Sequence, residues 1–191
     1  MASLTLYADS IQELRDVFVQ ISDLLDQGMS GSELNVTVHL SEKSYTFEDA
    51  YRNSYGQPVG SAVLSPYNPN NVEFSLHIVG NNAIIERSIT AQDEFNFVYG
   101  DMVVEDVTFQ NFETNGAIGG SNLVLRRCQF LNNQHFDYGA ANHVKGEGGA
   151  VSSFNASLLL IEDCLFDGNS AQFSSAVHIW YAEKVIIRNS I

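Results

Sequence analysis

Residues 158–169, LLLIEDCLFDGN, contain the pattern that decides the fold: an aliphatic strand, a polar pair and a Phe-x-x-Asn phrase. The same order of residue types occurs in residues 102–109 (MVVEDVTF) and 123–133 (LVLRRCQFLNN), and residues 185–191 (VIIRNSI) begin it a fourth time. A unit of this size cannot bury its own apolar face, so its copies must stack on one another. The sequence therefore predicts a stack of short, parallel strands.

The spacing of the copies indicates one turn of a solenoid per copy. Val104, Leu125, Ile161 and Ile187 are equivalent positions, and the steps between them are 21, 36 and 26 residues. Removing the 14 polar and Gly-rich residues 134–147 shortens the middle step to 22. Units of this length fit a coil of a parallel β-helix, whereas the residue frame of leucine-rich repeats is absent. We predict an all-β solenoid, a parallel β-helix of about five or six coils.

Residues 10–27 differ in kind, because their apolar residues have helical spacing. The predicted apolar face consists of Ile11, Leu14, Phe18, Ile21, Leu24 and Leu25. Ser10 and Glu13 form a capping box at the start, and Gly28 is a suitable stop. We predict an amphipathic capping helix over the first coil, since the open end of a solenoid exposes apolar core and unpaired strand edges.

Length and composition indicate a single domain over residues 1–191, with coils from residue 34 onward. The chain is 45% hydrophobic but has no run of 18 apolar residues and no visible secretory signal, so we expect no transmembrane segment. Its net charge of −14 argues against nucleic acid as a partner. The copy that starts at residue 185 is not followed by a cap. We therefore expect the N-terminal part of a longer protein, whose later coils, or a partner chain, cover the open end.

The two cysteines occupy the same position in consecutive copies. Stacking would bring the Cα atoms of Cys128 and Cys164 to about 5 Å, which is within disulfide range. Parallel neighbours in register point their Cβ bonds side by side, however, and this geometry suits a disulfide poorly. We favour two small inward residues in a column with Val107 and Ser190.

The chain resembles the repeats of polymorphic outer-membrane proteins, whose motifs are F-x-x-N and G-G-A-[ILV]. Residues 130–133 (FLNN), 166–169 (FDGN) and 148–151 (GGAV) match these motifs, whereas residues 109–112 (FQNF) depart at the last position. Upstream, residues 79–84 (VGNNAI) are similar to the strand–turn–strand phrase that precedes such repeats in bacterial surface proteins. The resemblance implies a right-handed parallel β-helix of the pectin-lyase-like superfamily, in the cell-surface or extracellular part of an adhesin.

Charged pairs follow the aliphatic strand of each copy and alternate in sign. They are Glu105-Asp106, Arg126-Arg127, Glu162-Asp163 and Arg188-Asn189. Opposite charges on neighbouring strands stabilise a sheet, and this accounts for the alternation. Polysaccharide lyases place carboxylates that hold Ca²⁺ beside a basic Arg or Lys, which is the alternative interpretation. No motif for Ca²⁺ is present, and we expect no cofactor and no catalytic residue.

The insertion at residues 134–147 is the best candidate for a binding loop, because loops that leave a solenoid commonly carry specificity, and the alternative interpretation is a plain solvated excursion. Its candidate ligand-binding residues are His135, Phe136, Asp137, Tyr138, His143, Lys145 and Glu147. The aromatic residues suit sugar rings, and His with carboxylates suits a metal, although the spacing has no metal-ligand signature. A second candidate contact is His178 with Trp180, which alternate outward on one strand.

Two hypotheses follow for the function. The first is a non-enzymatic scaffold or adhesin fragment at the cell surface or outside the cell, which contacts carbohydrate or a host or partner protein. The alternative is a carbohydrate-binding or polysaccharide-cleaving β-helix. A groove that holds paired carboxylates and a base would separate the two.

Overall fold

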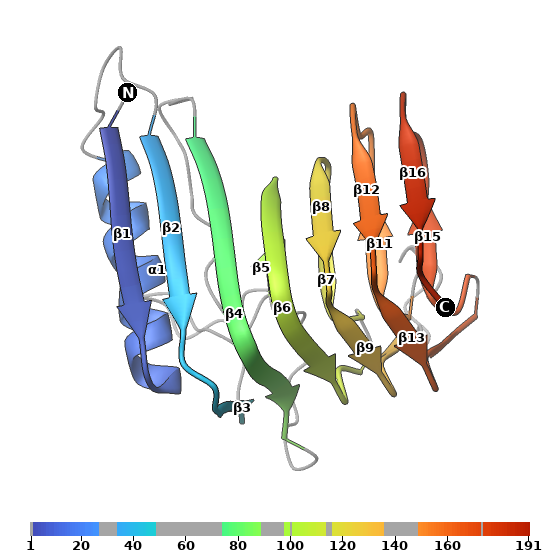
Figure 1. The fold of residues 1–191 in the computed structure, drawn as a ribbon, viewed down its shortest axis with the longest axis horizontal. Coiled ribbons are helices and arrows are strands. Elements are labelled where there is room, and N and C mark those ends of the chain that lie inside the picture. The colour runs from blue at the N-terminus through green and yellow to red at the C-terminus, as the bar shows by residue number, and fades with distance from the viewer. Residues whose placement is uncertain are drawn as a thin grey trace, which may run out of the picture.

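The structure, a computed structural model, describes residues 2–26, 34–48, 74–88, 98–99, 101–113, 116–135, 149–172 and 174–191. These residues form a ten-stranded parallel sheet, a four-stranded sheet, a two-stranded sheet and one α-helix. The main sheet runs in the order β1-β2-β4-β6-β8-β12-β16, and Figure 1 shows these strands side by side from the N-terminal to the C-terminal end.

The main sheet also contains three strands that lie off this path. Its members are β1 (Ala2–Ala8), β2 (Leu34–Leu40), β3 (Ser44–Phe47), β4 (Phe74–Arg87), β6 (Met102–Gln110), β8 (Leu123–Arg126), β9 (Gln129–Leu131), β12 (Leu159–Glu162), β13 (Leu165–Asp167) and β16 (Val185–Arg188). The four-stranded sheet consists of β5 (Val98–Tyr99), β7 (Ile118–Gly120), β11 (Val151–Ser153) and β15 (Val177–Ile179). The two-stranded sheet pairs β10 (Gln134–His135) with β14 (Ser170–Ala171).

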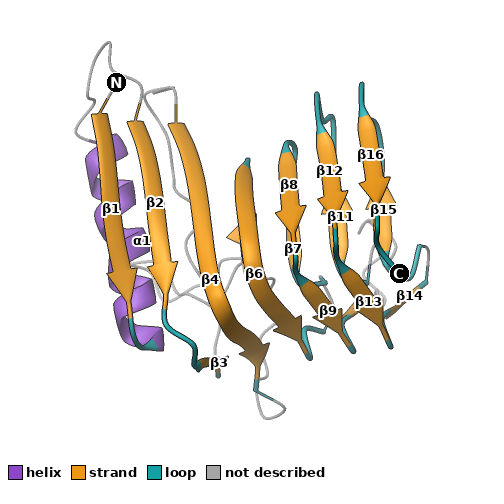
Figure 2. Cartoon of the chain, in the orientation of Figure 1, coloured by secondary structure: helices purple, strands orange, loops and turns teal. Residues whose placement is uncertain are grey.

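The predicted fold class, an all-β solenoid in the form of a right-handed parallel β-helix, is wrong. The fold is mixed α/β: a ten-stranded parallel sheet carries the helix α1 (Ile11–Asp26), and the described residues do not form a closed solenoid. The physical reason lies at the N-terminal end, where a 16-residue helix supplies the apolar layer that further strands would supply in a solenoid. Figure 2 shows this helix behind β1, and the four-stranded sheet begins only with β5.

The N-terminal end is a β–α–β unit, which the sequence analysis did not predict. Strand β1 pairs in parallel with β2, from Ala2 opposite Leu34 to Ala8 opposite Leu40. Parallel neighbours need a crossover connection, and α1 lies between these two strands in the sequence. The helix packs against β1 and β3. It therefore covers a face of the sheet, and the outermost position belongs to β1.

The helix itself is confirmed, with bounds one residue inside the predicted 10–27 at each end. The Ser10 hydroxyl accepts a hydrogen bond from the Glu13 amide at 3.2 Å, while the Glu13 carboxylate accepts one from the Asp9 amide at 2.7 Å. Two donors of the first turn are thereby satisfied. Four residues of the predicted apolar face, Leu14, Phe18, Ile21 and Leu25, have no exposed surface, and the other two, Ile11 and Leu24, are partly buried against the core.

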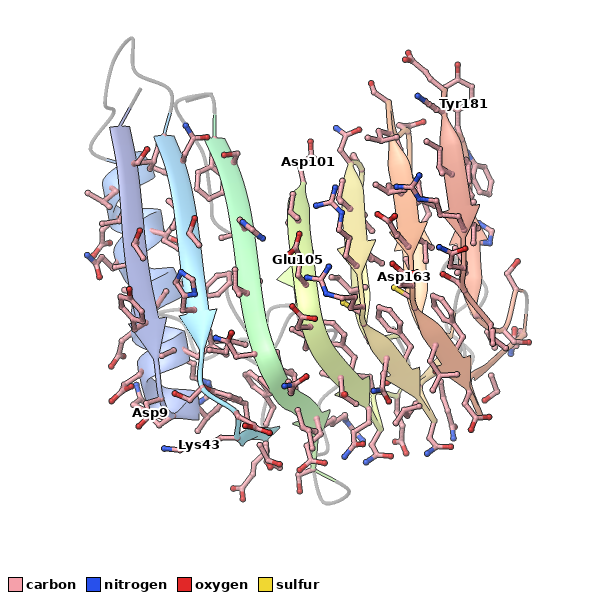
Figure 3. The ribbon with its side chains drawn as sticks, viewed as in Figure 1. Asp9, Lys43, Asp101, Glu105, Asp163 and Tyr181 are labelled. Carbon is pink, nitrogen blue, oxygen red and sulfur yellow. The ribbon has the colours of Figure 1, made fainter. Side chains whose placement is uncertain are left out.

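Polar contacts join the end of β1 to the segment that follows β2. The Tyr45 hydroxyl donates to the Ala8 carbonyl at 2.6 Å and accepts from the Ser41 amide at 3.0 Å. Asp9 and Lys43, labelled in Figure 3, form an ion pair at 2.8 Å on the surface nearby. Both backbone groups are satisfied by one side chain, so the otherwise apolar Tyr45 ring can be fully buried.

The predicted register of the later strands is confirmed. Val104 pairs with Leu125, Leu125 with Ile161, and Ile161 with Ile187. The first three have no exposed surface, because each has a strand on both sides. The alternation of inward and outward side chains along each strand sets this register, since a slip by one residue would turn the aliphatic side chains to the outer face.

Sharp bends follow the aliphatic residues, and they occur at stacked positions with left-handed backbone. Asp106, Arg127, Asp163 and Asn189 have φ of 57°, 51°, 54° and 51°. In β4, the position next to the Asp106 bend is a bulge between Val79 and Ala83. Gly80 is required there, because a Cβ on it would lie 2.2 Å from the Asp106 carbonyl oxygen.

Two columns of side chains join the later copies inside the molecule. The rings of Phe109, Phe130 and Phe166 stack with centroids 5.2 and 4.9 Å apart. The Asn133 amide donates to the Phe109 carbonyl at 3.1 Å and accepts from the Phe112 amide at 3.1 Å. The Asn169 amide in turn bonds to the Phe130 carbonyl at 2.8 Å and to Asn133 at 3.0 Å. The final Asn of the F-x-x-N phrase therefore binds the backbone of the neighbouring copy.

Candidate functional site

Charged side chains form a continuous ladder on the outer face of β6, β8, β12 and β16. In the register of the sheet, Glu105 lies opposite Arg126, Arg126 opposite Glu162, and Glu162 opposite Arg188. The Arg126 Nη1 atom lies 2.8 Å from Glu105 Oε1, and its Nε atom lies 3.4 Å from Glu162 Oε2. The Arg188 Nη2 atom lies 2.5 Å from Glu162 Oε1. Arg126 on β8 therefore bridges the carboxylates of the two strands that flank β8, which are β6 and β12.

Glu105 is the most heavily contacted member of the ladder, and Figure 3 labels it on β6. Besides Arg126, it accepts a hydrogen bond from Arg127 at 2.9 Å and lies 3.8 Å from His77. Partial burial alone would raise the pKa of Glu105, but the hydrogen bonds from Arg126 and Arg127 outweigh burial and lower the pKa below its ordinary value. The contact with His77 was missed, because only the register of β4 brings this residue beside the ladder.

Arg127 lies at the bend and binds the two acids of the preceding copy. Its Nε and Nη2 atoms donate to both oxygens of Asp106, at 2.7 and 2.9 Å. The Asp106 hydrogen bonds, followed by that of Glu105, raise the pKa of Arg127 above its ordinary value. A guanidinium in this environment is fixed in its charged form, so it is unsuited to abstract a proton.

A second polar column, which the sequence analysis missed, aligns the starts of the strands. The Asn122 amide groups donate to Asp101 through the backbone at 2.9 Å and through the side chain at 2.7 Å. Its side-chain oxygen accepts from the backbone amides of Ser157 and Leu158 at 2.8 and 3.0 Å. The sequence pattern that could have predicted this column is the polar residue directly before each strand, Asp101 before β6 and Asn122 before β8.

The outermost strand β16 leaves apolar side chains exposed. Leu159 and Ile161 on β12 have no exposed surface, whereas their partners Val185 and Ile187 on β16 are 43% and 52% exposed. Among the strands that the structure describes, β16 pairs only with β12. Its other edge is therefore an open parallel edge beside exposed apolar residues. We call residues Val185 to Arg188, with the backbone side that does not face β12, the β16 edge.

The two cysteines lie next to each other, each directly after a bend: Cys128 after Arg127 and Cys164 after Asp163. Both thiols are free and buried, and each lies near a backbone carbonyl of the preceding copy: Cys128 near Val104, Cys164 near Leu125. The hydrogen bond with Cys164, followed by burial, raises the pKa of the Cys128 thiol. The backbone amide of Cys164 donates to the Ser190 hydroxyl at 3.1 Å, as expected for neighbours in one column. A shallow hollow of about 280 Å³ lies against both cysteines and the Asp163 bend.

The predicted binding loop lies almost wholly outside the described residues. This applies to Phe136, Asp137, Tyr138, His143, Lys145 and Glu147. Only the backbone of His135 is described, at the end of β10, where it pairs with Ala171. The loop residues therefore remain a prediction.

The second predicted contact, His178 with Trp180, is a loose aromatic group on and beside β15. Trp180 is 66% exposed, and its ring centroid lies 6.4 Å from that of His178. The ring centroid of Phe154 lies 6.1 Å from that of His178. The exposure of Trp180 agrees with the prediction, and Tyr181 beside it, labelled in Figure 3, is 60% exposed.

In the described part of the chain, no three His, Cys, Asp or Glu residues are placed to hold a metal ion together. The helix α1 is neither long nor apolar enough to cross a membrane, in agreement with the prediction of no transmembrane segment.

Comparison with known proteins gives no match: no protein-family model, no curated protein and no solved structure matches the chain.

Proposed function

We propose that the chain is a non-enzymatic scaffold of a cell-surface or extracellular protein, in which a further strand, from a later segment of the same protein or from a partner chain, pairs with the β16 edge. The observation that carries this proposal is the exposure of Val185 and Ile187, at positions that are fully buried one strand earlier. Addition of a strand is the interaction for which such an edge is suited, because free backbone groups supply affinity and alternate side chains supply specificity. The cell-surface location rests on the resemblance of the F-x-x-N and G-G-A-V phrases to bacterial surface repeats.

The charged ladder supports a structural role for the outer face. The base of a lyase must be deprotonated before it can take a proton from the substrate. Arg126 and Arg127 each bind two carboxylates, which hold the guanidinium groups in their protonated form. The ion pairs of the ladder join neighbouring strands: β6 with β8, β8 with β12, and β12 with β16. The ladder therefore stabilises the sheet on which the β16 edge is presented.

A peptide that copies residues 157–168, with Ser in place of Cys164, tests the proposed interaction. In the structure this segment binds the downstream edge of β8, so it is a strand of suitable shape for the downstream edge of β16. We expect the labelled peptide to bind the full chain, as measured by fluorescence anisotropy. The variant Ile187→Lys should abolish binding, because a charge replaces an apolar contact.

The matched control is Val19→Lys, which changes an apolar residue that is 39% exposed on α1, away from the β16 edge. This variant should bind the peptide as the wild type does. Equal binding by Ile187→Lys and wild type, or no binding by either, would refute the proposal.

The enzymatic alternative has its own test. The chain is incubated with polygalacturonate and Ca²⁺, and the absorbance of unsaturated products is followed. We expect no increase over the protein-free sample. Product formation that Arg126→Ala or Arg127→Ala abolishes would replace the scaffold proposal with a lyase.

A further inference from the structure

The two free thiols form a pair in the interior of the stack, between described strands on both sides. Strand β12 is in register with β8, and β13 with β9, so Cys164 lies directly opposite Cys128. Strand β6 lies on the other side of Cys128. On the other side of Cys164 lies Ser190, whose hydroxyl accepts a hydrogen bond from the Cys164 amide at 3.1 Å. The pair therefore has the same neighbours whichever segment covers the β16 edge.

The two thiols are not equivalent, because only one of them reaches the surface. Cys128 has no exposed surface, whereas Cys164 is 4% exposed, and both line the hollow of about 280 Å³ beside Arg127 and Asp163. The hydrogen bond with Cys128 lowers the pKa of Cys164, and the same hydrogen bond raises the pKa of Cys128. The thiolate is the reactive form of cysteine. Cys164 is therefore the thiol that is better placed to react with a small molecule from solvent.

The spacing of the pair allows a disulfide but does not favour a relaxed one. Opposite Cα atoms of parallel neighbours lie about 5 Å apart, which is within disulfide range. The Cβ bonds run side by side, however, and each sulfur lies near a backbone carbonyl, Cys128 at 3.5 Å from Val104 and Cys164 at 3.6 Å from Leu125. Closing the bond would turn both sulfurs away from these carbonyls and strain the link. Strained disulfides are easily reduced, so a bond formed here is reversible.

From this arrangement we infer that Cys128 and Cys164 are a reversible redox pair, in which a hydroperoxide oxidises Cys164 and Cys128 then closes a disulfide. In the first step, the Cys164 sulfur attacks one peroxide oxygen: an S–O bond forms, the O–O bond breaks, and the other oxygen leaves as water or an alcohol. In the second step, the Cys128 sulfur displaces the hydroxyl group: an S–S bond forms, the S–O bond breaks, and water leaves with the Cys128 proton. The two thiols lose two electrons in total, and one hydroperoxide gains them.

The disulfide would join two successive copies across the insertion. Residues 128 and 164 are 36 positions apart, and the segment between them contains residues 134–147. Oxidation therefore links the copy of β8 and β9 covalently to the copy of β12 and β13, in addition to their hydrogen bonds. This inference goes beyond the proposed function and does not rest on it, since the β16 edge takes no part in the reaction.

Counting free thiols in the full chain tests the pair. The folded protein is freed of reductant, treated with hydrogen peroxide and then unfolded in urea with iodoacetamide, and alkylated cysteines are counted by mass spectrometry. We expect a monomer in which neither cysteine is alkylated and two hydrogen atoms are lost. Reduced glutathione should then restore two alkylatable thiols. A sample that is unfolded in urea before peroxide is added serves as the comparison.

Two single variants separate the roles of the thiols. Ser190 occupies the same column in the next copy, so serine is accepted there and we expect Cys128→Ser and Cys164→Ser to fold. Cys128→Ser should accumulate a sulfenic acid at Cys164, which dimedone traps, because the second thiol is missing. Cys164→Ser should give no dimedone adduct under the same treatment. The opposite labelling would overturn the assignment of Cys164 as the reactive thiol.

The thiol count also gives the outcomes that overturn the pair itself. If both thiols of the folded chain stay alkylatable under peroxide that oxidises the unfolded chain, the cysteines are small core residues only. A disulfide between two chains, or one that glutathione does not reduce, would equally contradict a reversible pair within one chain. Circular dichroism checks that each variant is folded, and if either is not, the thiol count of the wild type alone decides.

Discussion

At the scale of single residues, the side chains that join neighbouring copies differ in how much stability they provide. Asn133 is fully buried and satisfies backbone groups of another copy, so its loss leaves polar atoms without partners away from water. The members of the charged ladder lie at the surface, where water screens their attraction. The buried amide column therefore fixes the stack more firmly than the charged ladder does.

Replacing Asn133 by Ala tests the amide column. The Phe109 carbonyl and the Phe112 amide would lose their partner, and we expect the free energy of unfolding to fall by about 2–4 kcal/mol. Urea unfolding followed by circular dichroism gives the value. The control is the adjacent Asn132→Gly, at an exposed position with φ of 55°, which should change stability by less than about 0.5 kcal/mol. A similar loss in both variants would contradict the role assigned to Asn133.

The carboxylate of Glu105 gives the fold a dependence on pH. Its pKa is lowered in the folded state, so the charged form contributes stability above the ordinary Glu pKa of about 4.3. This contribution is lost as the pH falls through the lower folded-state pKa. We expect Glu105→Gln to reduce the free energy of unfolding by about 1 kcal/mol at pH 6 and to have little effect near pH 3.

Urea titrations of wild type and Glu105→Gln across this pH range measure the difference. The exposed Glu183→Gln is the control and should track wild type at every pH. A difference that stays constant from pH 6 to pH 3 would show that the effect of Glu105 does not depend on its charge.

At the scale of elements, α1 is what makes the N-terminal end of the sheet stable. Its four fully buried residues lie in the same apolar core as the inward residues of β2 and β3. At this end the helix covers the inner, apolar face of the sheet. Loss of the helix would expose that face of β1 and β2 together.

Truncation of Phe18 tests this dependence. Phe18→Ala removes a large side chain with no exposed surface, and we expect a loss of about 3–5 kcal/mol in the free energy of unfolding. Val19→Ala, one position along the same helix and 39% exposed, should cost less than about 1 kcal/mol. Denaturant unfolding of both variants provides the comparison, and a small loss for Phe18→Ala would mean that the sheet does not depend on the helix.

At the scale of the whole molecule, the middle strands have the most contacts, because they pair on both edges and their inward side chains are buried. Strand β8 has neighbours on both edges and fully buried inward residues, whereas β16 has one described neighbour and half-exposed ones. Among the described strands, β16 is therefore less supported than β8. This gradient is consistent with a scaffold that receives a partner at the β16 edge.

Hydrogen exchange of backbone amides should show the same gradient. We expect the amides of β8 to exchange through global unfolding and those of β16 to exchange at least about tenfold faster, because local opening of an edge costs less. Mass spectrometry of peptides from residues 123–126 and 185–188 resolves the two strands. Equal protection of both would contradict the proposal that β16 is an unsupported edge.

The sequence by itself determined the features that depend on local pattern and equal spacing. The register of Val104, Leu125, Ile161 and Ile187, the amide column of Asn133 and Asn169, and the amphipathic helix follow from periodicity, and the structure confirms them. The alternating charges were also visible, because outward residues of equal copies must meet in a parallel sheet.

Only the tertiary structure decided the fold class and the state of the edge. Whether α1 caps a coil or crosses from β1 to β2 depends on the pairing of Ala2–Ala8, and the alternation of Leu4 and Leu6 does not specify which strand this segment pairs with. The approach of His77 to Glu105 likewise depends on the register of β4, which the bulge after Val79 sets. Pairing between distant segments is a property of the assembled sheet, since many partners satisfy the same local pattern and only packing selects among them.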